Sequence, residues 1–470
     1  MMKKYIVCVL VSLIFCGVVF AQEKNPATQA EKLYEEANNA YTNKEYAKAI
    51  PLYLEAMACP EASEWRATIL YNVSCCYSLL GIADSAFEYL DQSIRAGNTD
   101  YRWIKKDTDF SSLGKNHPKE FEEMILRARA ARKNEILTKS PIAVVECSNY
   151  NGSTEITEYF NDSLDSPEMD SLRNRYQLRR VVESGKTEFE KMKLLLDWVA
   201  NRWKHNGDNM AIDRSALAIL KAAEKGERFC CANYADVLVG CMKALGYPAH
   251  FVGLRRDDAA YYMGGGHGCI EVWSNQYQKW ILLDGQNNAW WESGGLPLSA
   301  YECHQLLVSG KEDEMKFVGQ HKQVDYDHIK PDWSVHFYRV VCYWRGVGFE
   351  LVSDTIAPDL FLQGSPVDYE ITDDYTTVYP RLNQTKITLK HTNLKAPSDT
   401  LDVVLTHTMP CFDKFMVRIN GSDWKESKDT FRWVLDKGDN IIEAKAVNLA
   451  GIEGRPSSIV LRNNIETSGE

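Results

Sequence analysis

The sequence predicts a multidomain protein with an α-helical repeat module, a central α+β domain and a C-terminal all-β region. Three observations predict this class. A helical pattern repeats itself between residues 30 and 97, helices followed by short aromatic strands continue to about residue 308, and alternating strand patterns with tight turns begin after about residue 331. The 470 residues suffice for about three domains of about 150 residues each. We expect these domains at 25–136, 141–325 and 331–463, with a disordered tail at 464–470.

The N-terminal segment predicts export. A short positive segment from Met1 to Lys4 precedes an apolar run from Tyr5 to Phe20. This run is too short for a convincing membrane-spanning helix, and small residues stand at the two positions that a signal peptidase reads before a cut after Ala21. We therefore expect a signal peptide at 1–21 and a periplasmic, cell-surface or secreted chain that is not an integral membrane protein. Lipid attachment at Cys16 is the alternative.

The net charge restricts the class of binding partner, and the number of cysteines restricts disulfide pairing. The net charge of −11 becomes −13 when the two lysines of the signal are removed. Nucleic-acid binding relies on clustered Lys and Arg, and no such basic patch stands out, so we expect no nucleic-acid partner. Thirteen cysteines, two of them in the signal, leave an odd number in a compartment where disulfides persist. At least one thiol therefore lacks a partner within the chain.

The helical repeat consists of two copies displaced by 37 residues. Small or apolar positions correspond in the two copies: Ala37 with Ser74, Ala49 with Ala86, Tyr53 with Leu90 and Ala56 with Ser93. A period of this length, with small residues where helices touch, is typical of stacked helix pairs. The region resembles tetratricopeptide repeats, which implies a groove for a peptide or protein partner. A generic helical hairpin is the alternative.

The C-terminal region predicts a β-sandwich. Asn420-Gly421 is a tight-turn signal between an apolar run at 415–419 and the alternating Phe431, Trp433 and Leu435. Several short strands at this spacing favour a sandwich, and a small barrel is the alternative. The stretch 387–461 loosely resembles the immunoglobulin-like modules of exported bacterial enzymes.

The central domain contains a cysteine at the start of a buried helix. From Tyr234 to Leu245, apolar residues recur at the spacing of one helix face. Cys231 then lies in the first turn, where unpaired backbone NH groups and the helix dipole lower the pKa of a thiol. We interpret Cys231 as a nucleophile. Cys230 is expected to point in another direction and Cys241 to lie on the buried face, and we interpret both as structural.

A predicted hairpin supplies the partners of this cysteine. With a four-residue loop at 274–277, Glu271 pairs with Trp280 and His267 lies directly opposite Asp284. Asp284 can then fix the orientation of the imidazole, which leaves the other ring nitrogen of His267 for the thiol. Cysteine, histidine and aspartate in these places are typical of a nucleophile, its base and the residue that orients the base.

These residues resemble the transglutaminase-like superfamily of papain-type thiol enzymes. The resemblance rests on Cys-x-x-Tyr-Ala, Ala-Leu-Gly-Tyr-Pro-Ala, His-x-x-x-Glu-Val and Trp-x-x-x-Asp, and it covers about residues 187–307. It implies a papain/transglutaminase-like fold with a catalytic triad of Cys231, His267 and Asp284. The sequence departs from the family at two positions. Cys230 replaces a residue that is usually not cysteine, and Cys269 stands where family members often carry Trp.

The expected chemistry is acyl transfer from an amide of a peptide or protein substrate. Attack by the thiolate expels an amine and leaves an acyl-enzyme, which water or a second amine then resolves. We expect hydrolysis, as in a peptidase or deamidase, because a wet site favours water. A cross-linking transglutaminase and a catalytically silent domain in a binding or scaffold protein are the alternatives. No cofactor is expected, and the adjacent Cys230 and Cys231 would chelate one tetrahedral metal ion awkwardly.

Overall fold

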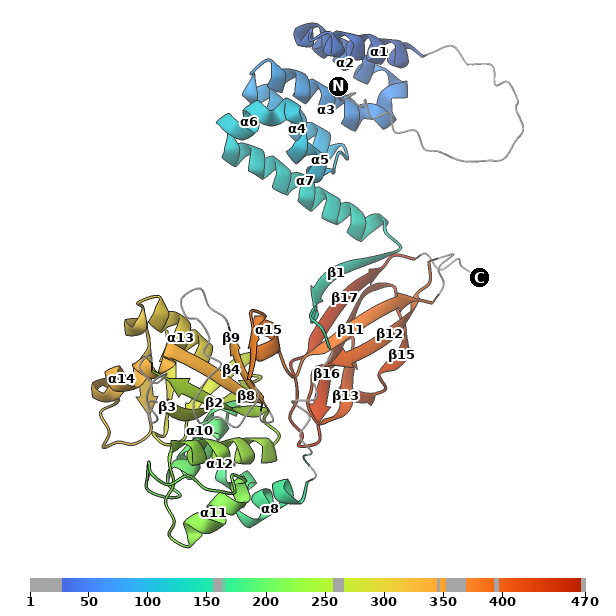
Figure 1. Cartoon of the computed structure of the whole chain (residues 1–470). Helices are drawn as coiled ribbons and strands as arrows, with labels where there is room; N and C mark the ends of the chain where they lie inside the picture. Colours follow the sequence, from blue (N-terminus) through green and yellow to red (C-terminus); the bar gives the residue numbers. More distant parts are fainter. Residues whose placement is uncertain are drawn as a thin grey trace. The chain divides into compact units, whose positions relative to one another are not determined.

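The computed structural model of the chain describes residues 28–154, 164, 166–256, 266–344, 347–351, 369–392 and 397–465. The chain divides into two compact units, residues 1–140 and 141–470 (Figure 1). The predicted signal peptide and Cys16, together with most of the predicted tail, lie outside the described residues. Among the described helices, none has both the length and the apolar character needed to cross a membrane.

The first unit is helical. Its helices are α1 (Gln29–Thr42), α2 (Tyr46–Ala58), η1 (Pro60–Trp65), α3 (Arg66–Leu79), α4 (Ala83–Arg95), α5 (Tyr101–Lys106), η2 (Thr108–Phe110), α6 (Ser111–Asn116) and α7 (Pro118–Lys139). The α1 helix packs against α2 and α3 packs against α4. The small residues of the two sequence copies, such as Ala49 and Ala86, are completely buried where these helices meet. Their size lets the helices pack closely, as their spacing in the sequence predicts.

The described residues of the second unit form three sheets. Its helices are α8 (Pro167–Arg175), α9 (Leu178–Val181), α10 (Glu188–Ala200), α11 (Ala216–Glu224), α12 (Cys231–Ala244), α13 (Ala300–Val308), η5 (Glu312–Glu314), α14 (Tyr326–Ser334), η6 (Val335–Tyr338) and α15 (Tyr375–Val378). The largest sheet has nine strands: β10 (Tyr369–Thr372), β9 (Val347–Leu351), β8 (Arg339–Trp344), β2 (Ala249–Arg255), β3 (Gly266–Ser274), β4 (Lys279–Asp284), β5 (Ala289–Ser293) and β6 (Leu296–Pro297) in this order, with β7 (Lys316–Gly319) paired to β5.

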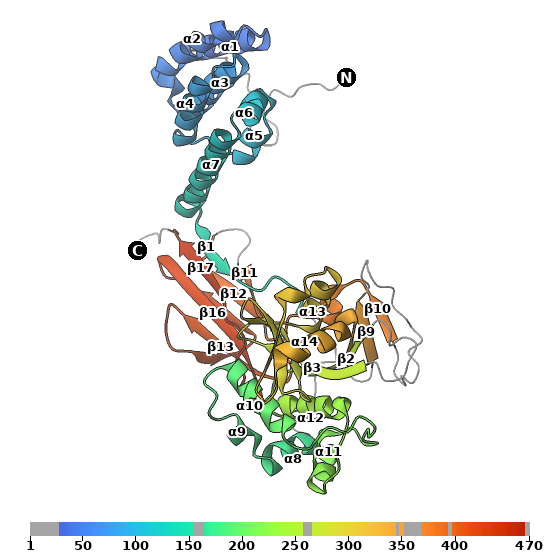
Figure 2. The same cartoon turned by 90° about the vertical axis from the view of Figure 1, so that its left-hand side faces the viewer.

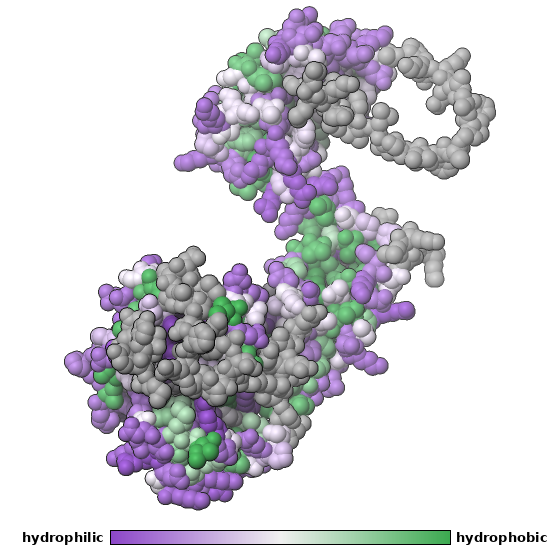
Figure 3. Space-filling view, viewed as in Figure 1, coloured by the Kyte–Doolittle hydropathy of each residue, from purple (hydrophilic) through white to green (hydrophobic). Residues whose placement is uncertain are grey.

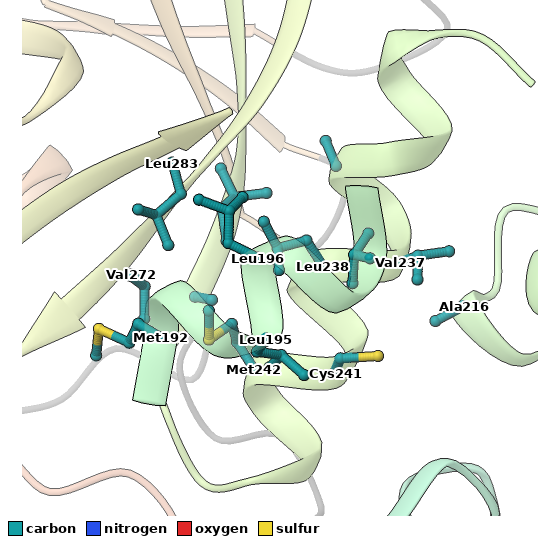
Figure 4. Packing of buried hydrophobic residues seen from close by; sticks show 14 of the residues in the cluster. Met192, Leu195, Leu196, Ala216, Val237, Leu238, Cys241, Met242, Val272 and Leu283 are labelled. Atoms are coloured by element: carbon teal, nitrogen blue, oxygen red, sulfur yellow. The ribbon is translucent and has the colours of Figure 1, made fainter. Parts of the chain in front are cut away.

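Helices cover both faces of this sheet. Figures 1 and 2 show α10 and α12 on one side of β2 and β3, with α13 and α14 on the other. On the α12 side, Ile270, Val272 and Leu283 pack against the helices in one apolar cluster (Figure 4). On the other side, Trp273 and Leu282 belong to a second cluster. Both faces of the central strands are therefore buried, which holds these strands and the residues at their ends in fixed positions.

The remaining strands form two sheets that share one core. The first contains β1 (Ile142–Ser148), β17 (Ser457–Asn463), β16 (Gly438–Asn448), β13 (Phe412–Ile419) and β14 (Lys425–Ser427), and the second contains β11 (Thr385–His391), β12 (Thr400–His407) and β15 (Thr430–Val434). Val403 of one sheet and Ile442 of the other are both fully buried in this core. The C-terminal region is thus strand-rich, with two packed sheets.

Long-range pairing differs from the predicted division of the chain. The predicted central domain at 141–325 includes β1, but β1 pairs with β17 of the C-terminal sheet. Strands β8, β9 and β10 follow the expected boundary near 325–331, yet β8 pairs with β2 and extends the central sheet. The Asn420-Gly421 turn leads into β14 and not into the strand that contains Phe431, because β15 belongs to the other sheet. Local patterns indicated β-structure in these regions but not which strands pair.

The surface is mainly hydrophilic on the face that Figure 3 draws, where hydrophobic residues form small separate patches. Hydrophobic side chains gather instead in the apolar clusters of the two units. The fold therefore depends on buried cores in each unit, as expected for a chain of this length.

Candidate functional site

The predicted nucleophile lies at the start of α12. Cys231 is the first residue of this helix and is half-buried, whereas Cys230 precedes it as the N-cap residue and is buried. The apolar face of α12 packs against α10, α11 and β3, and Cys241 lies on this face, as predicted (Figure 4). Gly246, just beyond the helix end, has a positive φ of 87° that favours glycine. The sequence therefore predicted the helix and the place of Cys231 correctly.

Two glycines allow the start of α12 to approach the sheet. A Cβ atom on Gly268 would lie 2.9 Å from Cα of Ala232, and one on Gly285 would lie 3.2 Å from Cβ of Tyr234. Any larger residue would push the helix away from β3. Gly268 is the neighbour of His267, so this close approach brings the helix start to the strand end that carries the predicted base.

His267 and Asp284 are in direct contact. Nε2 of His267 lies 2.8 Å from Oδ2 of Asp284, and the two residues are only 6% and 2% exposed. The backbone NH groups of Gln286 and Asn287 donate to Oδ1 of Asp284 at 3.1 and 3.0 Å, and the Asn287 side chain donates to Oδ2 at 2.7 Å. The turn after β4 thus holds the carboxylate, and Asp284 holds the imidazole so that Nδ1 is left for another partner.

The predicted register of this hairpin was wrong by two residues. Glu271 pairs with Leu282 and not with Trp280, and the loop is correspondingly one residue later at 275–278. His267 and Asp284 are therefore diagonal neighbours rather than directly opposed. They still meet because a shift of two residues keeps every side chain on its face of the sheet.

The pKa of Asp284 lies below its ordinary value. Burial by itself would raise this pKa, but the nearby His267 and the hydrogen bonds from His267 and Asn287 outweigh burial. The carboxylate therefore stays ionised at neutral pH. An ionised Asp284 can stabilise the imidazolium that forms when His267 accepts a proton.

The ionisation of Cys230 and that of Cys231 depend on each other, because the two thiols are hydrogen-bonded. Their mutual hydrogen bond lowers the pKa of Cys230 to about 6, and the backbone NH groups of Ala232 and Asn233 contribute to this lowering. The same hydrogen bond, followed by burial, raises the pKa of Cys231. The Cys230 sulfur lies near the helix start, where it also contacts Oδ1 of Asn233 at 3.5 Å. The expectation that Cys230 points in another direction is therefore wrong.

The Cys231 sulfur lies close enough to Asp284, another predicted site residue, to feel its charge. The NH group of Gly268 donates toward this sulfur, and the negative charge of Asp284 contributes to its raised pKa. Burial raises the pKa of Cys269, and the charges of Asp284 and Cys231 raise it further. The structure therefore brings the helix start with Cys231 to the end of the sheet where His267 and Asp284 meet.

Aromatic residues that the sequence did not indicate cover His267. The Trp333 ring of α14 lies 4.5 Å from the His267 ring, and the His336 ring of η6 stacks on Trp333 at 5.3 Å. Burial lowers the pKa of His336, and the proximity of His267 lowers it further. The His205 side chain is largely exposed, but its partial burial and the proximity of His267 lower its pKa too. These residues lie far from the motifs in sequence, so no local signal could have identified them.

One group in this site has the residue types of a metal centre. Ligand atoms of His267, Cys269 and Asp284 all lie within 4.8 Å of one another. His267 and Asp284 already satisfy each other through a hydrogen bond, which is the arrangement of a base and the acid that orients it. This contact fits proton transfer by His267 with Asp284 as the orienting acid.

Comparison with known proteins identifies one domain of the chain. Residues 175–285, which include all three predicted site residues, match the model of the Transglutaminase-like superfamily. A chloroplastic protein of Arabidopsis thaliana is 26% identical over 106 residues, which are 23% of this chain and 31% of that protein. The chain thus spans less than a third of the length of this curated relative.

Two solved structures show similarity to parts of the chain. A putative cysteine protease from Cytophaga hutchinsonii is 12% identical with a TM-score of 0.23, and the match covers 38% of this chain and 58% of that one. A red sea bream transglutaminase is 11% identical with a TM-score of 0.23, and the match covers 71% of this chain and 58% of that one.

Proposed function

We propose that this chain, which contains a transglutaminase-like domain at residues 175–285, is an exported cysteine enzyme that acts on amide bonds through an acyl-thioester. Cys231 is the nucleophile, His267 the base and Asp284 the residue that orients the base. The observation that carries this proposal is the buried contact of 2.8 Å between His267 and Asp284 beside the helix start that holds Cys231. An ordinary buried histidine needs neither an ionised partner nor a neighbouring thiol.

The proposed reaction uses the free nitrogen of His267. Nδ1 accepts the proton of the Cys231 thiol, and the thiolate attacks the carbonyl carbon of the substrate amide. The C–N bond then breaks, and the imidazolium returns the proton to the leaving amine. Asp284 stabilises the imidazolium in both steps through its hydrogen bond to Nε2. The Cys231 backbone NH, unpaired at the helix start, is the proposed donor to the oxyanion.

Hydrolysis is the proposed fate of the acyl-enzyme. Cys231 is half-buried and His205 is exposed, so water can reach the thioester beside His267. A water molecule would give its proton to His267 and attack the thioester carbonyl, which releases the acid and restores the thiol. A peptidase or a deamidase follows the same steps and differs only in the amide that is cleaved. Cross-linking would require an amine in place of this water.

The experiment compares amide substrates with two cysteine variants. Unlabelled peptides, isopeptides and glutamine-containing peptides are incubated with the mature chain, and free amine, ammonia and new ends are measured. Activity should disappear in Cys231→Ala and persist in Cys147→Ala, a matched exposed cysteine on β1. Ammonia release without incorporation of an added primary amine supports hydrolysis, whereas incorporation identifies a cross-linking enzyme. Equal turnover in wild type and Cys231→Ala would refute the proposed nucleophile.

A silent binding domain remains the second candidate function. The observation in its favour is the raised pKa of Cys231, because a protonated thiol is a poor nucleophile until a base removes its proton. Substrate-like acyl probes that trap thioesters distinguish the two functions. An enzyme forms an adduct on Cys231 that depends on His267, and a silent domain forms none.

The other regions support binding and export in this proposal. We propose that the helical unit is a tetratricopeptide-like module that binds a peptide or protein partner, and that the C-terminal strands form an immunoglobulin-like sandwich. The buried small residues Ala49 and Ala86 support the helical repeat. The apolar run at 5–20 supports a cleaved signal peptide and export, and the acidic net charge of −11 is unfavourable for nucleic acid.

A further inference from the structure

A second cluster of metal-binding residue types lies in the central sheet, outside the proposed catalytic site. It consists of His250 on β2, Glu271 on β3 and Cys342 on β8, which are 2%, 0% and 1% exposed. Their potential ligand atoms all lie within 4.8 Å of one another. The three side chains therefore converge on one point in the interior of the protein.

The strand register produces this convergence. His250 lies directly opposite Glu271 across β2 and β3. On the other side of β2, Cys342 lies opposite Val252, two residues from His250. Residues two apart on a strand share a face, so all three side chains project to the same side of the sheet. Three adjacent strands with both faces buried give the cluster a rigid frame.

The separations of the ligand atoms fit a tetrahedral ion. Nε2 of His250 lies 3.0 Å from Oε2 of Glu271, and Sγ of Cys342 lies 3.7 Å from the same oxygen. Zinc binds nitrogen and oxygen at about 2.0–2.2 Å and sulfur at about 2.3 Å, which places neighbouring ligands about 3.3–3.6 Å apart in a tetrahedron. Movements of a few tenths of an ångström would therefore bring the Nε2–Oε2 pair and the Sγ–Oε2 pair to these separations.

Neighbouring groups hold the ligands in place. The NH group of Ala300, at the start of α13, donates to Oε1 of Glu271 at 2.7 Å, which leaves Oε2 for the ion. The Tyr379 hydroxyl lies 3.4 Å from Sγ of Cys342 and can donate to its thiolate. Such outer contacts orient ligands in known metal sites.

We propose that His250, Glu271 and Cys342 bind one zinc ion that stabilises the central sheet. This proposal is independent of the proposed catalytic function. The Cys342 thiol gives its proton to solvent when the Zn–S bond forms, and neutral His250 and ionised Glu271 bind through their lone pairs. Two negative ligands then balance the dication, so the buried site carries no net charge. Three protein ligands leave the fourth coordination position to water.

The test measures zinc bound to the mature chain after dialysis, first against zinc and then against zinc-free buffer. Wild type should retain about one equivalent, and the zinc affinity of Cys342→Ser and His250→Gln should fall at least tenfold, as for lost metal ligands and their supports. Cys269→Ser is the matched control because Cys269 is equally buried on β3 but belongs to the His267 cluster. This control should retain zinc. Loss of zinc in Cys269→Ser with retention in Cys342→Ser would overturn the proposal.

Cobalt provides a second measurement that does not depend on folding of the Cys342 variant. Cobalt bound to a thiolate gives a sulfur-to-metal charge-transfer absorption. The absorption should appear in the double variant Cys231→Ala and Cys269→Ser, which retains Cys342. Its absence there, or equal zinc content in wild type and His250→Gln, would mean that the three residues form only a hydrogen-bonded network.

Discussion

Replacement of Cys230 by serine should make Cys231 more acidic. In the wild-type protein, the two sulfurs are hydrogen-bonded to each other, and a negative charge on Cys230 raises the pKa of Cys231. Serine does not ionise near neutral pH, so the variant has no negative charge at position 230. Its hydroxyl can also donate to a Cys231 thiolate, and serine is a favoured residue at a helix N-cap. The variant should therefore keep α12 and lower the pKa of Cys231.

The size of this effect follows from the contact of the two sulfurs. Two unit charges about 4 Å apart interact by about 4 kcal/mol at an effective dielectric constant of about 20. Cys231 is half-buried, and solvent screening reduces this energy. We take about 1.4 kcal/mol as the lower bound, which corresponds to about one unit of pKa and a tenfold change in the thiolate fraction.

The assay is alkylation of Cys231 as a function of pH. Iodoacetamide reacts with thiolates, and peptide mass spectrometry assigns the label to position 231 or 230 in each variant. The midpoint for Cys231 should lie at least about one pH unit lower in Cys230→Ser than in wild type. The double variant with Cys231→Ala controls for other thiols. An unchanged or higher midpoint in a folded Cys230→Ser would refute the charge coupling of the two cysteines.

Three further predictions concern the surroundings of the pair. Asp284→Asn should lower kcat by at least about a hundredfold with little change in KM, because the imidazole loses its orienting charge; a kcat within threefold of wild type would contradict this role. The lowered pKa of Asp284 stabilises the folded state above the ordinary carboxyl pKa near 3.9, and this stability is lost as pH falls through the lower folded value. The free energy of unfolding, measured with urea, should therefore fall more steeply with decreasing pH in wild type than in Asp284→Asn. Equal pH dependence in the two proteins would contradict this prediction. Gly268→Ala should lower the free energy of unfolding by about 1–3 kcal/mol, because its Cβ would lie 2.9 Å from Cα of Ala232. Gly226→Ala is the control: its Cβ has open space and its φ is positive, so it measures backbone strain without a steric clash.

The sequence by itself determined the helix of the site and the face of the hairpin. The apolar period of α12 located Cys231 at the helix start, because burial of one face requires that spacing. The hairpin expected from a four-residue loop placed His267 and Asp284 on a common face. This face survived a register error of two residues, because strand side chains alternate with a period of two.

Only the tertiary structure decided which distant segments meet. Strand β1 joined the C-terminal sheet and β8 joined the central one, because strand partners are selected by packing across the whole unit and leave no local signal. The same holds for Trp333 above His267 and for Cys342 beside Glu271. The contact between the Cys230 and Cys231 sulfurs, which makes the ionisation of each depend on the other, was also decided in space. Periodicity encodes which side of an element is buried, whereas contacts between elements depend on the folded chain.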